Sequence, residues 1–309
     1  MALSSLSLQQ RYLFDTLGFV VLRGVLSTEE VDLVNKGINK YSTTQFFERE
    51  GALRNSPLGS SGRRDCGSFL TWSREDGGDV LRSLLCHPTL YPVLNQLCGE
   101  GHRLDHKPVL FRQPNGCEGF DLHGGAVRKD GVYDFPISYH CQAGHMVCNL
   151  INVAVQFTSS PRGAGGFVVV PGSHKSNFPY PSCPEELQTM ADTYGYQPEC
   201  NPGDVVLFAE ACLHGAAVRM APEERRVALI RFAPATCAFA RGYLDQHSQF
   251  YEFLTEAQKA VVAPPYHEAY DRVKPRTVNG VLTSEAAVAQ GRRHDKKEFD
   301  KGVFKGEYF

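Results

Sequence analysis

The chain has 309 residues, 42% of them hydrophobic, which is enough apolar material for one large core. The formal net charge is −2 and the pI is about 6.6, so no basic field favours nucleic acid and no polybasic run favours an anionic membrane. A small-molecule substrate fits this composition better than a polyanion does.

The ten cysteines form no C-x-x-C pair, so a structural zinc site has no support. The first residues lack the charged and apolar regions of a secretory signal, and no run of about 18 apolar residues could span a membrane. We therefore expect free thiols, no membrane insertion, and a cytoplasmic or other reducing intracellular location. No feature indicates an oligomeric state.

The first hundred residues are predicted to be mainly helical. Near-helical spacing over 6–16 is followed by a short apolar strand from Gly18 to Leu22. Ser27 and Glu30 then form a capping box, which predicts a helix to about Lys40. We expect a long irregular loop over 43–78 and one helix over about 79–99.

Short β-rich runs separated by Gly, Pro and Asn fill residues 106 to 234. The expected strands are Pro108–Arg112, Val147–Phe157, Gly166–Val170, Asp204–Phe208 and Arg226–Phe232, and one short helix is expected near Pro184. This pattern predicts a mainly β fold with flanking helices, of the sandwich or jelly-roll type.

The simplest division of the chain is one catalytic domain over 1–283. It has a helical N-terminal part (about 1–100), a β core (about 106–234) and C-terminal helices and loops (235–283). A polar tail over 284–309 follows and is expected to be loosely held.

Two of the eleven histidines have a context that suggests metal binding. His214 is predicted near the end of an apolar strand that starts at Gly203-Asp204, and Arg225 follows eleven residues later. Antiparallel neighbouring strands would bring Arg225 back beside His214, where its guanidinium could hold a carboxylate of a 2-oxo acid. His123 lies between Gly-rich turns at the mouth of the β domain, and imidazole is a good ligand for Fe(II).

The remaining histidines have less support as ligands, because a lone histidine in a β domain is more often a satisfied polar residue. His140 and His145 are interpreted as loop residues or as residues behind the site. His87, His102, His106, His247, His267 and His294 have no special context.

The segment Pro171-Gly172-Ser173-His174-Lys175, preceded by GAGGFVVV, resembles the PGSHK segment of the phytanoyl-CoA dioxygenase family. The His214-to-Arg225 offset and the opening elements resemble the same family, and the resemblance covers most of residues 8–235. It implies a double-stranded β-helix (jelly roll, cupin-like) fold. It also implies an oxidoreductase that uses Fe(II), 2-oxoglutarate and O2 to attack an unactivated C–H bond.

Carried over residue by residue, the resemblance makes His123 and His214 the iron ligands and Arg225 the anchor of 2-oxoglutarate. Ser173 and His174 match a turn that is structural or near the site. The family's first motif is His-x-Asp, however, and here Gly125 stands in the carboxylate's place.

Gly125 leaves three interpretations open. A hydroxylating oxygenase could use a substitute ligand. A halogenase could bind chloride at the vacated position, as Fe/2-oxoglutarate halogenases with Gly or Ala there do. A non-catalytic binding protein could keep the fold without turnover; the intact Arg225 counts against this.

Water could complete a weaker two-histidine site, and two carboxylates are candidates for the substitute ligand. Asp121 would face the same way as His123 on a strand, but reaching the metal would need a bend. Glu210 is expected to be too distant, about 13 Å from His214 along an extended strand.

Residues 43–78 and 235–270 are expected to shape the substrate pocket, although ordinary loop packing is the more frequent role for each of their residues. The aromatic and basic residues in them are Phe46, Phe47, Arg63, Arg64, Trp72, Phe239, Arg241, Tyr243 and Tyr251.

Overall fold

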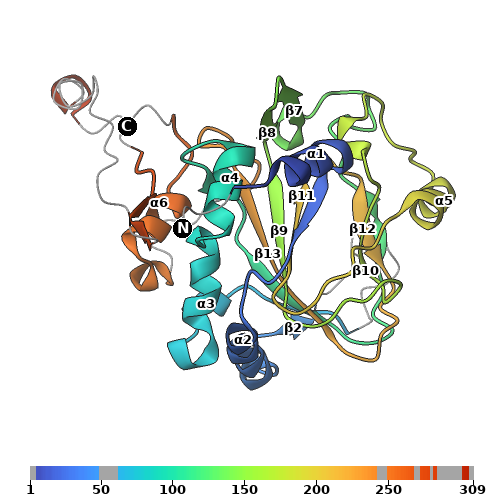
Figure 1. The fold of residues 1–309 in the computed structure, drawn as a ribbon, viewed down its shortest axis with the longest axis horizontal. Coiled ribbons are helices and arrows are strands. Elements are labelled where there is room, and N and C mark those ends of the chain that lie inside the picture. Colours follow the sequence, from blue (N-terminus) through green and yellow to red (C-terminus); the bar gives the residue numbers. More distant parts are fainter. Residues whose placement is uncertain are drawn as a thin grey trace.

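The computed structural model describes residues 5–48, 62–241, 249–267, 272–278, 281–283 and 301–305. The strands run antiparallel in two sheets that face each other, with helices on the outside of the larger sheet (Figure 1). This arrangement is the predicted jelly roll with flanking helices.

The larger sheet has the order β1-β11-β9-β13-β5-β3-β2, and β4 pairs with β13. Its strands are β1 (Phe19–Leu22), β2 (Phe47–Glu48), β3 (Arg64–Cys66), β4 (Arg103–Leu104), β5 (Val109–Gln113), β9 (Ile151–Gln156), β11 (Val205–Ala209) and β13 (Arg225–Ala233). The central strand β9 is buried along its whole length because helices cover one of its faces and the second sheet faces the other.

The smaller sheet has the order β10-β12-β6, built from β10 (Gly166–Val169), β12 (His214–Ala217) and β6 (Phe120–His123). Two hairpins complete the strands: β7 (Tyr139–Gln142) with β8 (His145–Cys148), and β14 (Arg276–Val278) with β15 (Val281–Thr283). A small apolar cluster packs α5 (Pro184–Tyr194) against the outer side of the smaller sheet through Leu122, Val168 and Leu187.

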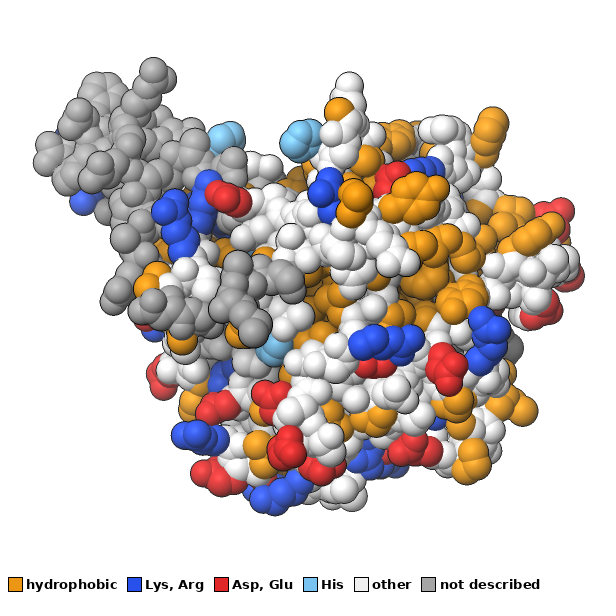
Figure 2. All heavy atoms as spheres, in the orientation of Figure 1, with side chains coloured by type: hydrophobic (Ala, Val, Ile, Leu, Met, Phe, Trp, Pro, Cys, Tyr) orange, Lys and Arg blue, Asp and Glu red, His pale blue; other side chains and the backbone are white. Residues whose placement is uncertain are grey.

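The remaining helices are α1 (Leu8–Leu17), α2 (Thr28–Tyr41), α3 (Gly78–Ser83), α4 (Leu90–Cys98) and α6 (Glu256–Val262). The capping box of Ser27 and Glu30 is present at the start of α2, as predicted. None of the helices among the described residues is long and apolar enough to span a membrane. Figure 2 shows acidic and basic side chains interspersed on one face, without a large field of one sign.

Three predictions of local structure were wrong. The helix expected over 79–99 is interrupted at His87, because the following proline disfavours helical geometry there. The single strand expected over Val147–Phe157 is two strands, β8 and β9. The loop expected over 43–78 contributes β2 and β3 to the edge of the larger sheet.

The N-terminal helix, the strand that follows it and the helix near Pro184 are confirmed. Most of the predicted polar tail, 284–309, lies outside the described residues.

Candidate metal and co-substrate site

His123 and His214 lie directly opposite each other in the smaller sheet. His123 is the last residue of β6 and His214 the first of β12, and the two are register partners. Their ring centroids are 4.2 Å apart, and both side chains are buried. The two histidines singled out from the sequence therefore form a pair, although 91 positions separate them along the chain.

The route by which the chain reaches His214 differs from the prediction. The apolar strand β11 ends at Ala209, a turn follows, and His214 opens a new strand in the other sheet. Arg225 opens β13 in the larger sheet, so it is not on a strand adjacent to β12. Arg225 and His214 nevertheless line the same cavity, because the two sheets face each other across it.

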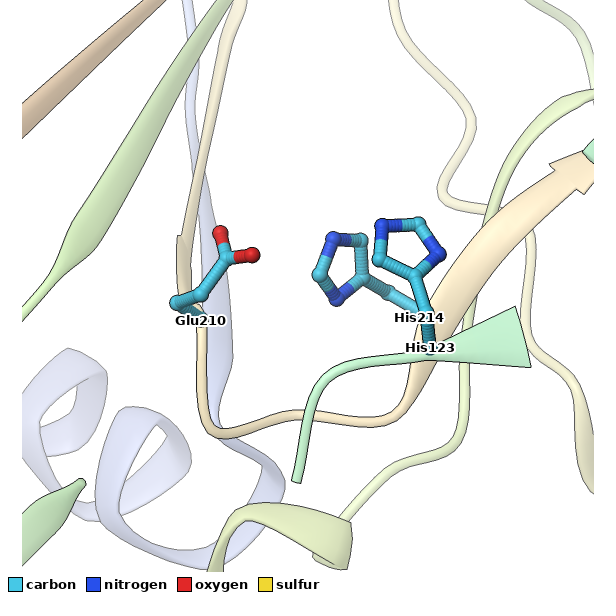
Figure 3. A group of neighbouring side chains, drawn as sticks. All are labelled: His123, Glu210 and His214. Atoms are coloured by element: carbon cyan, nitrogen blue, oxygen red, sulfur yellow. The ribbon is translucent and has the colours of Figure 1, made fainter. Parts of the chain in front are cut away.

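Glu210 completes a cluster with the two histidines. One ligand atom from each of His123, Glu210 and His214 lies within 4.8 Å of the others, and all three side chains are buried. Figure 3 shows the carboxylate directed toward the two imidazoles from the turn that follows β11. The prediction that Glu210 is too distant was wrong, because the backbone turns between Ala209 and His214 instead of continuing as a strand.

Hydrogen bonds to backbone carbonyls orient both imidazoles. His123 Nδ1 lies 3.0 Å from the Asp121 carbonyl oxygen, and His214 Nδ1 lies 2.8 Å from that of Cys212. A carbonyl only accepts, so each Nδ1 carries the proton of the neutral ring and Nε2 carries the lone pair. Such a contact behind a histidine ligand fixes the ring and its tautomer for metal binding.

The Glu210 carboxylate is held ionised in a buried position. Asn152 Nδ2 donates to its Oε2 at 2.6 Å, and Arg231 Nε lies 3.7 Å from the same oxygen. Burial favours the neutral acid, but the charge of His214 when that ring is protonated, the charge of Arg231 and the hydrogen bond from Asn152 outweigh it and hold the pKa of Glu210 well below its usual range. The carboxylate is therefore an anionic donor beside the two imidazoles.

Asp121 does not share the face of His123. The pairing of β6 with β12 shifts register between His123 and Phe120, and this β-bulge places an extra residue in β6. Asp121 lines a separate cavity beside α5 and is not part of the metal cluster. The simple alternation from which we predicted that Asp121 faces the same way as His123 fails at the bulge.

The two glycines after His123 have different roles. Gly124 has a φ of +103°, and a Cβ there would lie 2.3 Å from the Cys212 carbonyl oxygen and 2.7 Å from that of Glu210. Gly124 thus lets β6 approach the turn that carries Glu210. A Cβ on Gly125 would have Tyr180 and Val127 as its nearest neighbours, at 3.4 Å and beyond, and not the histidines.

Arg225 lies at the other end of a cavity of about 290 Å³ that also contains the metal cluster. Its Nη1 donates to Gln113 Oε1 at 2.6 Å, while its buried Nε has no hydrogen-bond partner. Burial, together with repulsion from Arg63 and Arg219, lowers the pKa of Arg225 to about 9, so it stays cationic at neutral pH. A buried cation with an unused donor is suited to bind an anion.

The aromatic and basic residues that were expected to shape the substrate pocket lie in different parts of the fold. Arg63 and Phe239 line the cavity, but Phe46 and Trp72 are core residues and Phe47 is exposed. Residue 243 lies outside the described residues.

The histidines given less weight lie elsewhere. His140 and His145 are exposed on the β7–β8 hairpin, away from the metal cluster. His174 is buried, and its Nε2 donates to the Asp15 carbonyl oxygen, which agrees with a structural role for the PGSHK turn.

Three residues around the site were missed from the sequence: Gln113, Asn152 and Arg231. Asn152 and Arg231 interrupt apolar stretches of β9 and β13, and that exception to the hydrophobic pattern was the available signal. Gln113 ends β5 beside Arg112 and has no such signal.

The family model "Phytanoyl-CoA dioxygenase (PhyH)" matches residues 14–227. The chain belongs to the phytanoyl-CoA dioxygenase family. This family consists of Fe(II)/2-oxoglutarate-dependent oxygenases, so the protein is an oxidoreductase of that class. A search of curated proteins gave no match.

Several solved structures share the fold of this chain. HygX from Streptomyces hygroscopicus, crystallised with nickel, 2-oxoglutarate and hygromycin B, is 22% identical with a TM-score of 0.61, and the match covers 76% of this chain and 90% of that one. EctD from S. alaskensis, crystallised with 2-oxoglutarate and 5-hydroxyectoine, is 20% identical with a TM-score of 0.55, over 74% and 77% of the two chains. The carbocyclase SnoK from nogalamycin biosynthesis is 15% identical with a TM-score of 0.55, over 81% and 91%.

Proposed function

We propose that this protein is an Fe(II)/2-oxoglutarate-dependent oxygenase that hydroxylates an unactivated C–H bond of a small or medium organic substrate. His123, Glu210 and His214 would bind the iron, and Arg225 would bind 2-oxoglutarate. The observation that carries the proposal is the cluster of two histidines and a carboxylate in one cavity with a buried, incompletely bonded arginine.

The donor set fits Fe(II). Two imidazoles and one carboxylate on one side of a metal are typical of non-haem Fe(II) oxygenases and leave positions for the co-substrate and O2. When bound, the iron supplies the chemistry in which O2 converts 2-oxoglutarate to succinate and CO2 and places one oxygen atom in the substrate's C–H bond. The protein's own part is to hold the three donors, with His123 and His214 fixed by carbonyls and Glu210 by Asn152.

Arg225 would bind the far carboxylate of 2-oxoglutarate. Gln113 holds one side of the guanidinium, which leaves the buried Nε as a donor. An ion pair in a site without bulk water is stronger and more specific than one at the surface. This pairing would orient the 2-oxo acid with its chelating end toward the histidines.

Glu210 supports hydroxylation over the two alternatives. It supplies the carboxylate that Gly125 does not, so a halide is not needed to complete the iron's ligands. In a halogenase, chloride would have to displace Glu210 or bind beside it. A non-catalytic protein that binds no metal here would have no need of a buried ionised carboxylate next to two oriented imidazoles. Burying such a carboxylate is costly unless the cluster binds a cation.

The test is succinate formation from 2-oxoglutarate with Fe(II) in air, measured together with Fe(II) affinity. We expect slow succinate formation without an added substrate, and loss of both properties in His123→Ala and His214→Ala. His140→Ala is the matched control, since His140 is exposed and outside the cluster. Absence of succinate together with absence of Fe(II) binding in the unaltered protein would instead support a binding protein.

A further inference from the structure

Gln113 and Arg225 are register partners on neighbouring strands, and Arg63 immediately precedes β3, the next strand of the same sheet. Arg225 of β13 pairs with Gln113 of β5, and Arg64 of β3 pairs with Arg112 of the same strand. Arg63 and Arg225 both line the cavity that contains the metal cluster.

The two guanidinium groups share an aromatic neighbour. Arg63 Cζ lies 4.4 Å from the centre of the Phe111 ring, and Arg225 Cζ lies 5.3 Å from it. Phe111 thus brings two cations to the same end of the cavity. Their mutual repulsion would be relieved by an anion between them.

Asp65 binds two of the three nitrogen atoms of the Arg63 guanidinium, which leaves the third as a donor for an anion. Its carboxylate accepts from Arg63 Nε at 2.7 Å and from Nη2 at 3.3 Å, whereas Nη1 makes no hydrogen bond to any described residue. The Arg63 side chain is 11% exposed, so most of it is shielded from bulk water. The ion pair with Asp65 orients Arg63 along the cavity wall.

We propose that Arg63 is a second arginine of the co-substrate site, so that the far carboxylate of 2-oxoglutarate is bound between Arg63 and Arg225. This inference rests on the proposed function. It makes the site selective for a 2-oxo acid with a second carboxylate, because a monocarboxylate would leave Arg225 Nε and Arg63 Nη1 without an anionic acceptor.

The test measures binding of 2-oxoglutarate to the full chain loaded with Ni(II), by calorimetry without O2. We expect Arg63→Gln to weaken binding about tenfold, the effect of losing one hydrogen bond between charged groups. Binding of 2-oxovalerate, which lacks the far carboxylate, should not change. Arg64→Gln is the matched control, because Arg64 pairs with the exposed Glu48 and does not line the cavity.

Asp65→Asn separates anion binding from a structural role. If Arg63 only supported the fold through its ion pair, Asp65→Asn and Arg63→Gln would weaken binding equally. If Arg63 binds the carboxylate, removing the negative charge of Asp65 should leave 2-oxoglutarate affinity unchanged or raise it. Thermal unfolding of the variants identifies any general loss of folding.

Comparing Arg63→Gln with Arg225→Gln separates a failure of this inference from a failure of the proposed function. Unchanged 2-oxoglutarate affinity in Arg63→Gln, with a large loss in Arg225→Gln, would overturn this inference and leave the proposed function intact. Unchanged affinity in both variants would overturn the proposed co-substrate site itself.

Discussion

Replacing Glu210 with glutamine should sharply weaken Fe(II) binding. The substitution keeps the size of the side chain and an oxygen that can accept from Asn152, but it removes the negative charge beside His123 and His214. It also removes the negative charge that lies 3.7 Å from Arg231, so less of the repulsion between that cation and the metal is balanced. Both effects disfavour the metal without removing bulk from the core.

The size of the effect can be bounded from below. Loss of a group that only supports a metal ligand typically costs 10- to 100-fold in affinity. Because Glu210 is one of only three donors, its loss should cost at least about 100-fold, or about 2.7 kcal/mol. The repulsion from Arg231 acts in the same direction.

The assay is anaerobic titration with Fe(II), with the melting temperature of the metal-free variant as a check on folding. Asp121→Asn is the matched control: it neutralises a carboxylate two residues from His123, but one that lines a different cavity. We expect the control to bind Fe(II) like the unaltered protein. If Glu210→Gln also bound Fe(II) with unaltered affinity, the reasoning that makes Glu210 a ligand would be refuted.

Three further changes test the account at other points. Gly125→Asp should not tighten Fe(II) binding in titration and should lower stability by about 1 kcal/mol or more, because the residue has a φ of +80° and its Cβ would face Tyr180. Gly124→Ala should reduce both stability and Fe(II) affinity, since its Cβ would overlap two carbonyl oxygens; normal Fe(II) affinity would contradict the described packing. Burial lowers the pKa of His102 to about 3 from an ordinary 6.5, so the unfolded chain binds the proton more tightly than the folded chain does. The free energy of unfolding therefore decreases as the pH falls from about 6.5 toward 3. Urea unfolding should show about 2 kcal/mol of this loss between pH 6.5 and 5, absent in His102→Phe.

The local signals that predicted the fold were short-range. The capping box at Ser27 gave the start of α2, and proline at 184 gave the start of α5. The break at His87 was also encoded, by the proline that follows it, but the apolar spacing on both sides suggested one continuous helix.

The histidine pair was predictable because each residue sits beside glycines at the end of a β run. The proposed third ligand, Glu210, was not predictable, because its position depends on a backbone turn. Glu210 and His214 would be distant on a strand, and only the turn after Ala209 brings them together. The bulge in β6 likewise turns Asp121 away from a face that simple alternation assigns to it.

The aspartate that the family motif has at position 125 is therefore proposed to be replaced by a carboxylate from elsewhere in the chain. The position after Gly124 adopts a left-handed conformation and faces Tyr180, so a carboxylate there would start from a strained backbone. In the proposed site Glu210 supplies the carboxylate instead, from a segment that approaches because Gly124 has no side chain.

The most direct test of the account is a crystal structure of the protein grown without O2 in the presence of Fe(II), 2-oxoglutarate and chloride. We expect iron bound by His123, Glu210 and His214, with 2-oxoglutarate extending from the metal to Arg225. Iron bound by the two histidines and chloride, with Glu210 turned away, would contradict hydroxylation by this site. Iron at any other position would contradict the site itself.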